Sequence, residues 1–194
     1  MARTRAINPD KFIMIRDAAI ELFYKNGIEN TSISSIAKAA GVAKGTIYLY
    51  FKDREALIND VTRFCFEKHL AYSMRELDKY STSCGKLKQR IKNILVWSQE
   101  NKKESAVIRY YYVPVNIYGT KNVFFDKSYD INKSIIQEGI TNGEFKSLPI
   151  DFVCKIFFSS VEGISSYTRE NPDVLKEEIL IDKMLDAVID CIRK

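Results

Sequence analysis

Apolar residues recur every three or four positions along almost the whole chain, the spacing that places them on one face of an α-helix. The strict alternation typical of a half-buried strand is absent, and the 194 residues include only 8 glycines and 4 prolines. Hydrophobic residues make up 46% of the sequence and charged residues 28%, as in a globular chain rather than a disordered one. The sequence therefore predicts an all-α protein of about nine helices.

Capping residues and chain breaks predict where these helices begin and end. Asn8 is expected to cap a first helix that runs from Pro9 to Asn26. The other expected ranges are 33–40, about 43–51, a long helix capped by Asp53, and then 84–101, 104–113, 122–142, 150–169 and 174–193. In this interpretation Pro114 ends one of the helices.

Positive charge is concentrated near the N-terminus. Residues 1–52 carry four more Lys and Arg than Asp and Glu, whereas residues 53–194 supply only one unit of the total net charge of +5. A small basic part attached to a nearly neutral body is what a nucleic-acid contact at one end of the molecule requires. The same count would also arise from an uneven solvated surface.

Residues 32–52, SISSIAKAAGVAKGTIYLYFK, contain two short amphipathic segments separated by a tight turn at Gly41. This is the spacing of a helix-turn-helix unit. The apolar residues expected to hold the two helices together are Ile36, Ala37, Ala40, Val42, Ile47 and Phe51. The second segment leaves Lys44, Thr46 and Tyr48, with the backbone of Gly45, to face a DNA major groove and its flanking phosphates.

The same segment resembles the TetR family of bacterial transcriptional regulators. The resemblance is carried by Ile-Ala-Lys-Ala-Ala-Gly-Val at 36–42, Lys-Gly-Thr-Ile-Tyr-Leu-Tyr-Phe-Lys at 44–52 and Glu-Ala-Leu at 55–57, and it is close over 13–57. It implies a three-helix DNA-binding domain at 1–52. A long fourth helix would join this domain to a ligand-binding and dimerisation bundle, so that 53–194 forms the second domain.

The resemblance also implies roles for individual residues. Thr31 or Ser32 would bind phosphate at the start of the second helix. The residues implied to contact base edges or their surroundings are Lys44, Gly45 and Thr46, and those implied to clamp phosphates are Tyr48, Tyr50 and Lys52. An ordinary helix would also use Thr31 or Ser32 as a cap, and Tyr48 and Tyr50 would also suit half-buried packing positions. Ala43 departs from the family pattern, in which a serine often caps the recognition helix.

Aromatic residues are concentrated after residue 80. As a set they predict an apolar ligand cavity between helices, although each of them would also fit a plain helical core. The ligand-binding candidates are Trp97, Tyr111, Tyr118, Phe125 and Phe158. Arg109 and Glu162 would be polar anchors of the cavity if they point inward, or surface residues otherwise. Residues 138–145, EGITNGEF, resemble a segment of TetR members that respond to fatty acyl thioesters, and they also suit an ordinary helix end.

The last two helices have broad apolar arcs. On the final helix one stripe comprises Ile181, Leu185, Val188 and Ile192, and a second comprises Leu180, Met184, Ala187 and Cys191. Two stripes predict burial on two sides, one against the chain's own bundle and one against a second copy. The sequence thus predicts a homodimer through these two helices, with Val161 and Leu185 at the contact.

Other classes of function are disfavoured. The four cysteines are widely spaced and His69 is the single histidine, which argues against a metal site, a catalytic thiol and any catalytic residue or cofactor. No apolar run is long enough to span a bilayer, so we expect a soluble, cytoplasmic protein without a membrane partner. The leading hypothesis is a dimeric repressor that binds a double-stranded palindromic operator and is released by a small apolar or amphipathic effector. The alternatives are a DNA-bound adaptor for a protein partner and an enzyme with an unrecognised site.

Overall fold

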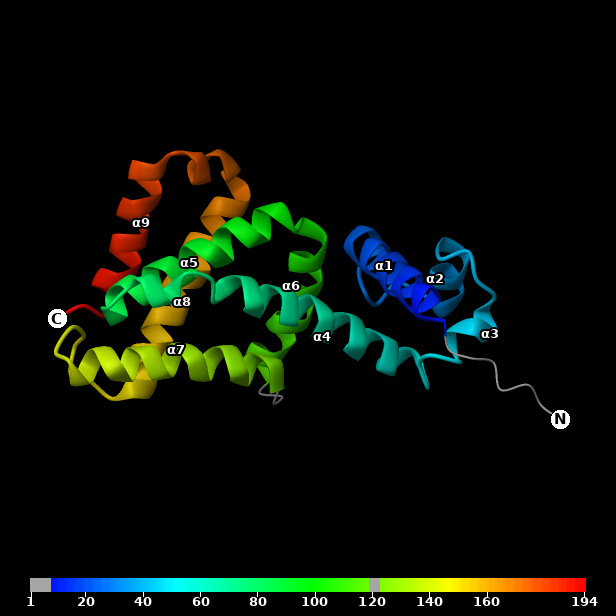
Figure 1. Ribbon diagram of the computed structural model, residues 1–194, viewed down its shortest axis with the longest axis horizontal. Helices are drawn as coiled ribbons and strands as arrows, with labels where there is room; N and C mark the ends of the chain where they lie inside the picture. The colour runs from blue at the N-terminus through cyan, green and yellow to red at the C-terminus, as the bar shows by residue number, and fades with distance from the viewer. Residues whose placement is uncertain (1–7, 119–122) are drawn as a thin grey trace. The chain divides into compact units, whose positions relative to one another are not determined.

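The computed structural model describes residues 8–118 and 123–194, with their side chains outside 111–126 (Figure 1). Over these residues the fold is all-α, as predicted, with nine α-helices and two short 3₁₀ segments. The helices are α1 (Pro9–Asn26), α2 (Ile33–Ala39), α3 (Lys44–Ile47), α4 (Arg54–Ser73), α5 (Ser83–Glu100), α6 (Lys102–Tyr118), α7 (Val123–Thr141), α8 (Ile150–Glu170) and α9 (Glu178–Asp190). The 3₁₀ segments are η1 (Leu77–Lys79) and η2 (Pro172–Lys176). None of the helices in this part of the chain is long and apolar enough to cross a membrane.

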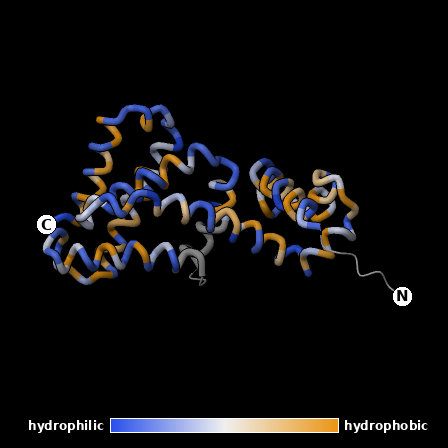
Figure 2. Tube along the Cα trace, in the orientation of Figure 1, coloured by the Kyte–Doolittle hydropathy of each residue, from blue (hydrophilic) through white to orange (hydrophobic). Residues whose placement is uncertain are grey.

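The chain divides into two compact units. The first comprises Met1–Glu67 and Lys102–Thr120, and the second comprises Lys68–Asn101 and Lys121–Lys194. Helix α4 therefore begins in the first unit and ends in the second. Hydrophobic and hydrophilic residues alternate along the helices of each unit (Figure 2), as the sequence periodicity predicts.

The first unit is built around α1. The residues buried at its core are Ile15, Ala19 and Phe23 of α1, Ile36 and Ala37 of α2, Ile47 of α3, Leu57 and Val61 of α4, and Val107 of α6. The Arg16 guanidinium lies 3.5 Å from the centre of the Phe64 ring, a cation–π contact between α1 and α4. Asn8 caps α1 by accepting a hydrogen bond from the Asp10 amide, as predicted.

The second unit packs α5, α7, α8 and α9 around an aliphatic core. Its buried residues include Leu87, Ile91 and Leu95 of α5, Ile136 of α7, Phe157 and Ile164 of α8, and Ile181, Leu185 and Ile189 of α9. The side chains of Leu185 and its stripe therefore point into their own bundle. The predicted contact of Leu185 with a second copy is wrong, because Leu185 is only 2% exposed in a single chain.

Residues 138–145 comprise the end of α7 and the turn after it, and they contact the start of α5. The Glu144 carboxylate accepts hydrogen bonds from the amides of Ser83 and Cys84, at 3.0 and 2.9 Å, and so caps α5 from about sixty positions away along the chain. A Cβ at Gly139 would lie 2.3 Å from the buried Phe145 ring. Capping and close packing thus account for these residues in the way the helix-end interpretation predicts.

Three helix boundaries differ from the prediction. Helix α6 continues past Pro114 to Tyr118, because a proline removes one backbone donor without always ending a helix. The predicted last helix is divided into η2 and α9. Helix α3 is shorter than predicted, and the chain continues from it through turns in which the amides of Leu49 and Tyr50 bond three residues back.

Candidate DNA-binding site

Helices α2 and α3 are joined by a tight turn. Gly41 adopts φ of +65°, a left-handed conformation that favours glycine. The Val42 amide then donates to the Ala37 carbonyl at 2.9 Å, so the chain doubles back directly against α2. The small Ala37 side chain is buried at this close approach, as the sequence predicts.

The start of α2 carries a reciprocal capping arrangement. The Ser35 amide donates to the Ser32 hydroxyl at 3.0 Å, and the Ser32 amide donates to the Ser35 hydroxyl at 3.1 Å. Ser32 is exposed, whereas Thr31 is 2% exposed and its hydroxyl donates to the Gly27 carbonyl at 2.7 Å. Of the two predicted phosphate-binding residues, only Ser32 presents its side chain at the surface.

Helix α3 presents one face to solvent and the other to the core. Lys44, Gly45 and Tyr48 are exposed, as is Lys52 beyond the helix, while Thr46 is half-buried. Ile47 is fully buried and anchors the helix to the first core. The structure thus brings four of the predicted contact residues together on one exposed segment, with three of them carrying a cationic or hydroxyl group.

Tyr50 lies in a different setting from Tyr48. It is half-buried, and its hydroxyl donates to the Asn8 carbonyl at 2.9 Å and accepts from the Asn8 amide at 3.1 Å. Its ring also contacts Phe12. Tyr50 therefore ties the turn after α3 to the start of α1, a structural role that the sequence left open.

The N-terminus of α3 has no side-chain cap. Ala43 occupies the N-cap position and makes no capping hydrogen bond. Because an N-cap contributes about 1 kcal/mol, its absence helps to explain why the helix is so short. Sequence reasoning anticipated this weakness at Ala43.

Two residues of this surface were not predicted. Ser35 completes the capping arrangement of α2, and the Ser-x-x-Ser spacing from Ser32 was the signal for it. Leu49 is 52% exposed beside Tyr48, although its apolar character suggested a core position.

The ligand-binding candidates of the second unit are only partly described. Trp97 is 2% exposed and contacts the His69 ring edge-on at 4.9 Å. Phe158 stacks on Tyr129 at 5.2 Å. The side chains of Tyr111, Tyr118 and Phe125 lie outside the described residues. Arg109 and Glu162 are exposed, which agrees with the surface alternative rather than with polar anchors of a cavity.

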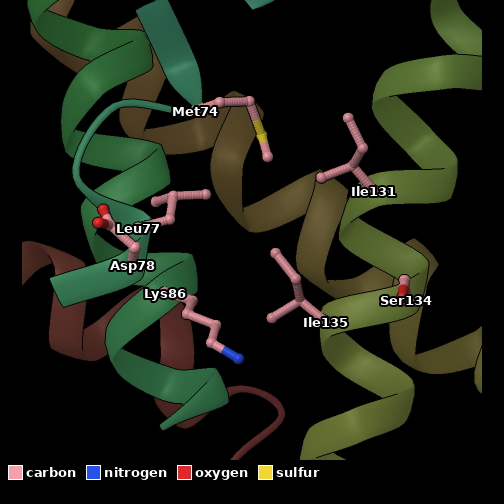
Figure 3. A pocket seen from close by; sticks show the side chains of 7 residues that line it. All are labelled: Met74, Leu77, Asp78, Lys86, Ile131, Ser134 and Ile135. Carbon is pink, nitrogen blue, oxygen red and sulfur yellow. The ribbon is translucent and has the colours of Figure 1, made fainter. Parts of the chain in front are cut away.

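A groove of about 320 Å³ lies in the second unit between η1 and α7 (Figure 3). Its lining residues are Met74, Leu77, Asp78, Lys86, Ile131, Ser134 and Ile135. Neither Trp97 nor Phe158 lines it, so this groove is not the aromatic cavity that the sequence predicts.

Two ionisable residues in the interior of the second unit, His69 and Arg90, have lowered pKa values. Burial, together with the positive charge of Arg90, lowers the pKa of His69 to about 4, which leaves its imidazole neutral at physiological pH. Burial also lowers the pKa of Arg90 to about 10, so that its guanidinium remains charged. Neither residue was singled out by the sequence as part of a ligand site.

Comparisons with known proteins cover both parts of the chain. Residues 15–61 match bacterial regulatory proteins of the tetR family, and residues 74–194 match the C-terminal region of QacR-like proteins. The transcriptional regulator QacR of Staphylococcus aureus is 30% identical over 159 residues, covering 80% of this chain and 85% of QacR. The fatty acid metabolism regulator protein of Bacillus subtilis is 26% identical over 163 residues, 78% of this chain and 80% of that protein.

Solved structures show the same fold. A putative TetR regulator from Shewanella has a TM-score of 0.77 at 18% identity, over 95% of this chain and 98% of that one. The regulator FadR from Bacillus subtilis, in complex with stearoyl-CoA, has a TM-score of 0.72 at 23% identity, over 94% and 100% of the two chains. Together with the helix-turn-helix geometry, these matches establish that the chain belongs to the TetR family of DNA-binding transcriptional regulators.

Proposed function

We propose that this regulator is a homodimeric repressor that binds a palindromic operator and is released by a small amphipathic effector. The family consists of transcription regulators rather than enzymes. The observation that carries the proposal is the exposed α3 face of Lys44, Gly45 and Tyr48, held on a buried Ile47. In this proposal residues 1–52 form the DNA-binding domain and residues 53–194 the ligand-binding and dimerisation domain.

The proposed DNA contacts divide by chemistry. Lys44, Gly45 and Thr46 face base edges, and Tyr48, Lys52 and Ser32 bind flanking phosphates. Thr31 and Tyr50 act through packing, because their hydroxyls already bond within the protein. The contacts then supply both sequence readout and a salt-dependent affinity.

The outer faces of α8 and α9 support the proposed dimer. Phe152 is 52% exposed and Leu180 is 38% exposed in the single chain. A hydrogen bond of 3.4 Å from the Ser160 hydroxyl to Cys191 places the outer stripe of α9 beside α8. Exposed apolar residues that recur along two adjacent helices are typical of a protein interface.

The proposed effector binds to the second unit. The likeness to FadR, whose structure holds stearoyl-CoA, supports an amphipathic molecule with an apolar chain. Because α4 runs from the first unit into the second, a ligand that moves it would change the spacing of two recognition helices in a dimer. Such coupling is reciprocal, so the operator must weaken effector binding by the same factor, typically about fivefold to a hundredfold.

Footprinting on the DNA upstream of the protein's own gene tests the proposal. We expect two protected half-sites about one helical turn apart, with two protein chains bound. A transcriptional reporter behind this DNA should become more active when the regulator is deleted. An intact footprint with no small-molecule release from any amphiphile would instead favour the protein-partner adaptor, and no footprint would contradict operator binding.

A further inference from the structure

Arg90 is a cation in the interior of the second unit. It lies on α5 and is 1% exposed, between the core residues Leu87 and Ile91. Its guanidinium donates to the Asn132 amide oxygen and, at 2.9 Å, to the Ser128 hydroxyl, both on α7. Its Nε is buried and has no hydrogen-bond acceptor in the described structure.

The acceptors that Arg90 does have are neutral. Among the residues that the structure describes, no carboxylate forms an ion pair with it, although the half-buried cations Lys86, Lys88 and Arg193 of the same unit are paired. A buried charge is costly unless an opposite charge and hydrogen bonds compensate for it. The Arg90 guanidinium therefore carries a positive charge that no carboxylate of the described chain pairs with, and its Nε donor has no acceptor there.

The guanidinium lies toward the Trp97 end of α5. Lys86 reaches Glu138 whereas Arg90 reaches Asn132 and Ser128, so α5 and α7 run antiparallel. Trp97 follows Arg90 by seven positions, which places it on the same face of α5, two turns away. The groove of Figure 3 is lined by Lys86, one turn in the opposite direction. Arg90 is not among the residues that line that groove.

We propose that Arg90 binds the anionic head group of the effector, which is an amphiphile ending in a carboxylate or a phosphate. The inference rests on the proposed function, since it specifies the ligand of that same effector site. A carboxylate or phosphate oxygen would accept from Nε and neutralise the guanidinium, whose planar fork of N–H donors can bind two oxygens of either group. The neighbouring His69 imidazole is neutral and adds no competing charge.

A series of ligands with one chain length and different head groups tests this proposal. Decanoate, decyl phosphate, decanol and decyltrimethylammonium are titrated into the full-length protein, with binding measured by calorimetry and by Trp97 fluorescence. The two anions should bind at least about tenfold more tightly than decanol, and the cation most weakly. The ratio between the carboxylate and the phosphate identifies the preferred head group.

Variants test whether Arg90 is the cause of the tighter binding of the anions. Arg90→Met should abolish the difference between the anions and decanol, and Arg90→Lys should retain part of it because the charge remains. Lys92→Met removes one positive charge from the same helix and should leave the preference unchanged. Thermal unfolding shows whether each variant folds. We expect Arg90→Met to unfold at a temperature no lower than the unliganded wild type, because it removes an uncompensated buried charge.

Three results would overturn the inference. One is that decanol binds as tightly as the anions, and another is that Arg90→Met keeps the preference. A third is that Arg90→Met unfolds at a much lower temperature while Arg90→Lys binds all four ligands equally, which would make Arg90 a purely structural residue. If decanol still releases the operator in any of these cases, the proposed function stands without this inference. If none of the four ligands binds, both fail.

Discussion

The surface proposed to read DNA depends on a few residues whose neighbours in the sequence are buried. Lys44 and Tyr48 are exposed because Ile47, between them, is fixed in the core. Ala43 gives the helix that carries them no cap, so its first turn is held by backbone bonds alone, such as that from the Thr46 amide to the Ala43 carbonyl at 2.8 Å. The proposed readout thus rests on a short helix that has no side-chain cap.

Replacing Ala43 with serine should strengthen this helix. A serine hydroxyl at the N-cap accepts a first-turn amide and stabilises a helix by about 1 kcal/mol. We expect Ala43→Ser to raise the free energy of unfolding by that amount, measured by urea denaturation. Ala43→Val, which also has no side-chain acceptor, is the control and should give no such gain. A stability equal to that of the wild type would show that the first turn of α3 gains nothing from a cap.

His69 should make the protein sensitive to acid. Its pKa is about 4 in the folded protein and about 6.5 when unfolded, so the unfolded chain binds the proton more readily between these values. Stability should therefore fall as the pH is lowered through this window, by about 2 kcal/mol between about pH 7 and about pH 5.

The measurement is the free energy of unfolding across that pH range. His69→Gln cannot titrate there and should lose most of the pH dependence, whatever its stability at neutral pH. A wild type and a variant with the same pH dependence would contradict a buried, neutral His69.

At the scale of whole helices, caps and periodicity predicted most of the fold. Helix α1 begins and ends where Asn8, Pro9 and Gly27 place it, because those signals are local. The break between η2 and α9 was missed, since no glycine or proline stands between Lys176 and Glu178 to mark it. The cap that Glu144 gives to α5 was also out of reach, because it joins segments about sixty positions apart.

The sites show the same division between local and long-range information. The residues proposed to read DNA lie in one segment, so the sequence alone was enough to propose them. Arg90 was overlooked because an arginine between apolar residues is usually solvated, and only the position of α7 shows that it is buried. Which stripe of α9 faces outward likewise depends on the packing of the bundle.

The long-range cap predicts a stability effect. Glu144→Gln keeps the size of the side chain but replaces the charged carboxylate, which accepts hydrogen bonds from the amides of Ser83 and Cys84, with a neutral amide. We expect a loss of about 1 to 2 kcal/mol in the free energy of unfolding. Glu138→Gln, which breaks an exposed ion pair with Lys86 nearby, should cost less than about 1 kcal/mol. Equal losses in the two variants would argue against a specific cap.

For the whole molecule, the outer faces of α8 and α9 predict a dimer. Leu180→Glu places a charge on the exposed stripe and should give folded monomers, because an unpaired carboxylate buried at an interface costs several kcal/mol. Leu185→Glu instead places the charge in the core and should unfold the protein. Sedimentation and helical content are the measurements. A wild-type mass equal to that of one 22.4 kDa chain would contradict the dimer.

The salt dependence of operator binding tests the account most directly. The affinity of the wild type for the duplex upstream of its gene should fall steeply as salt is raised, since Lys and Arg displace counterions from phosphates. Lys44→Ala, which removes a proposed base-edge contact, should weaken binding by about 1 to 3 kcal/mol, and Lys52→Ala, which removes a proposed phosphate contact, should reduce the slope of log affinity against log salt by about one. Lys25→Ala, which removes an exposed lysine paired with Glu21 on α1, should change neither quantity. An affinity for the duplex that is the same in the wild type and in Lys44→Ala would contradict DNA reading by α3.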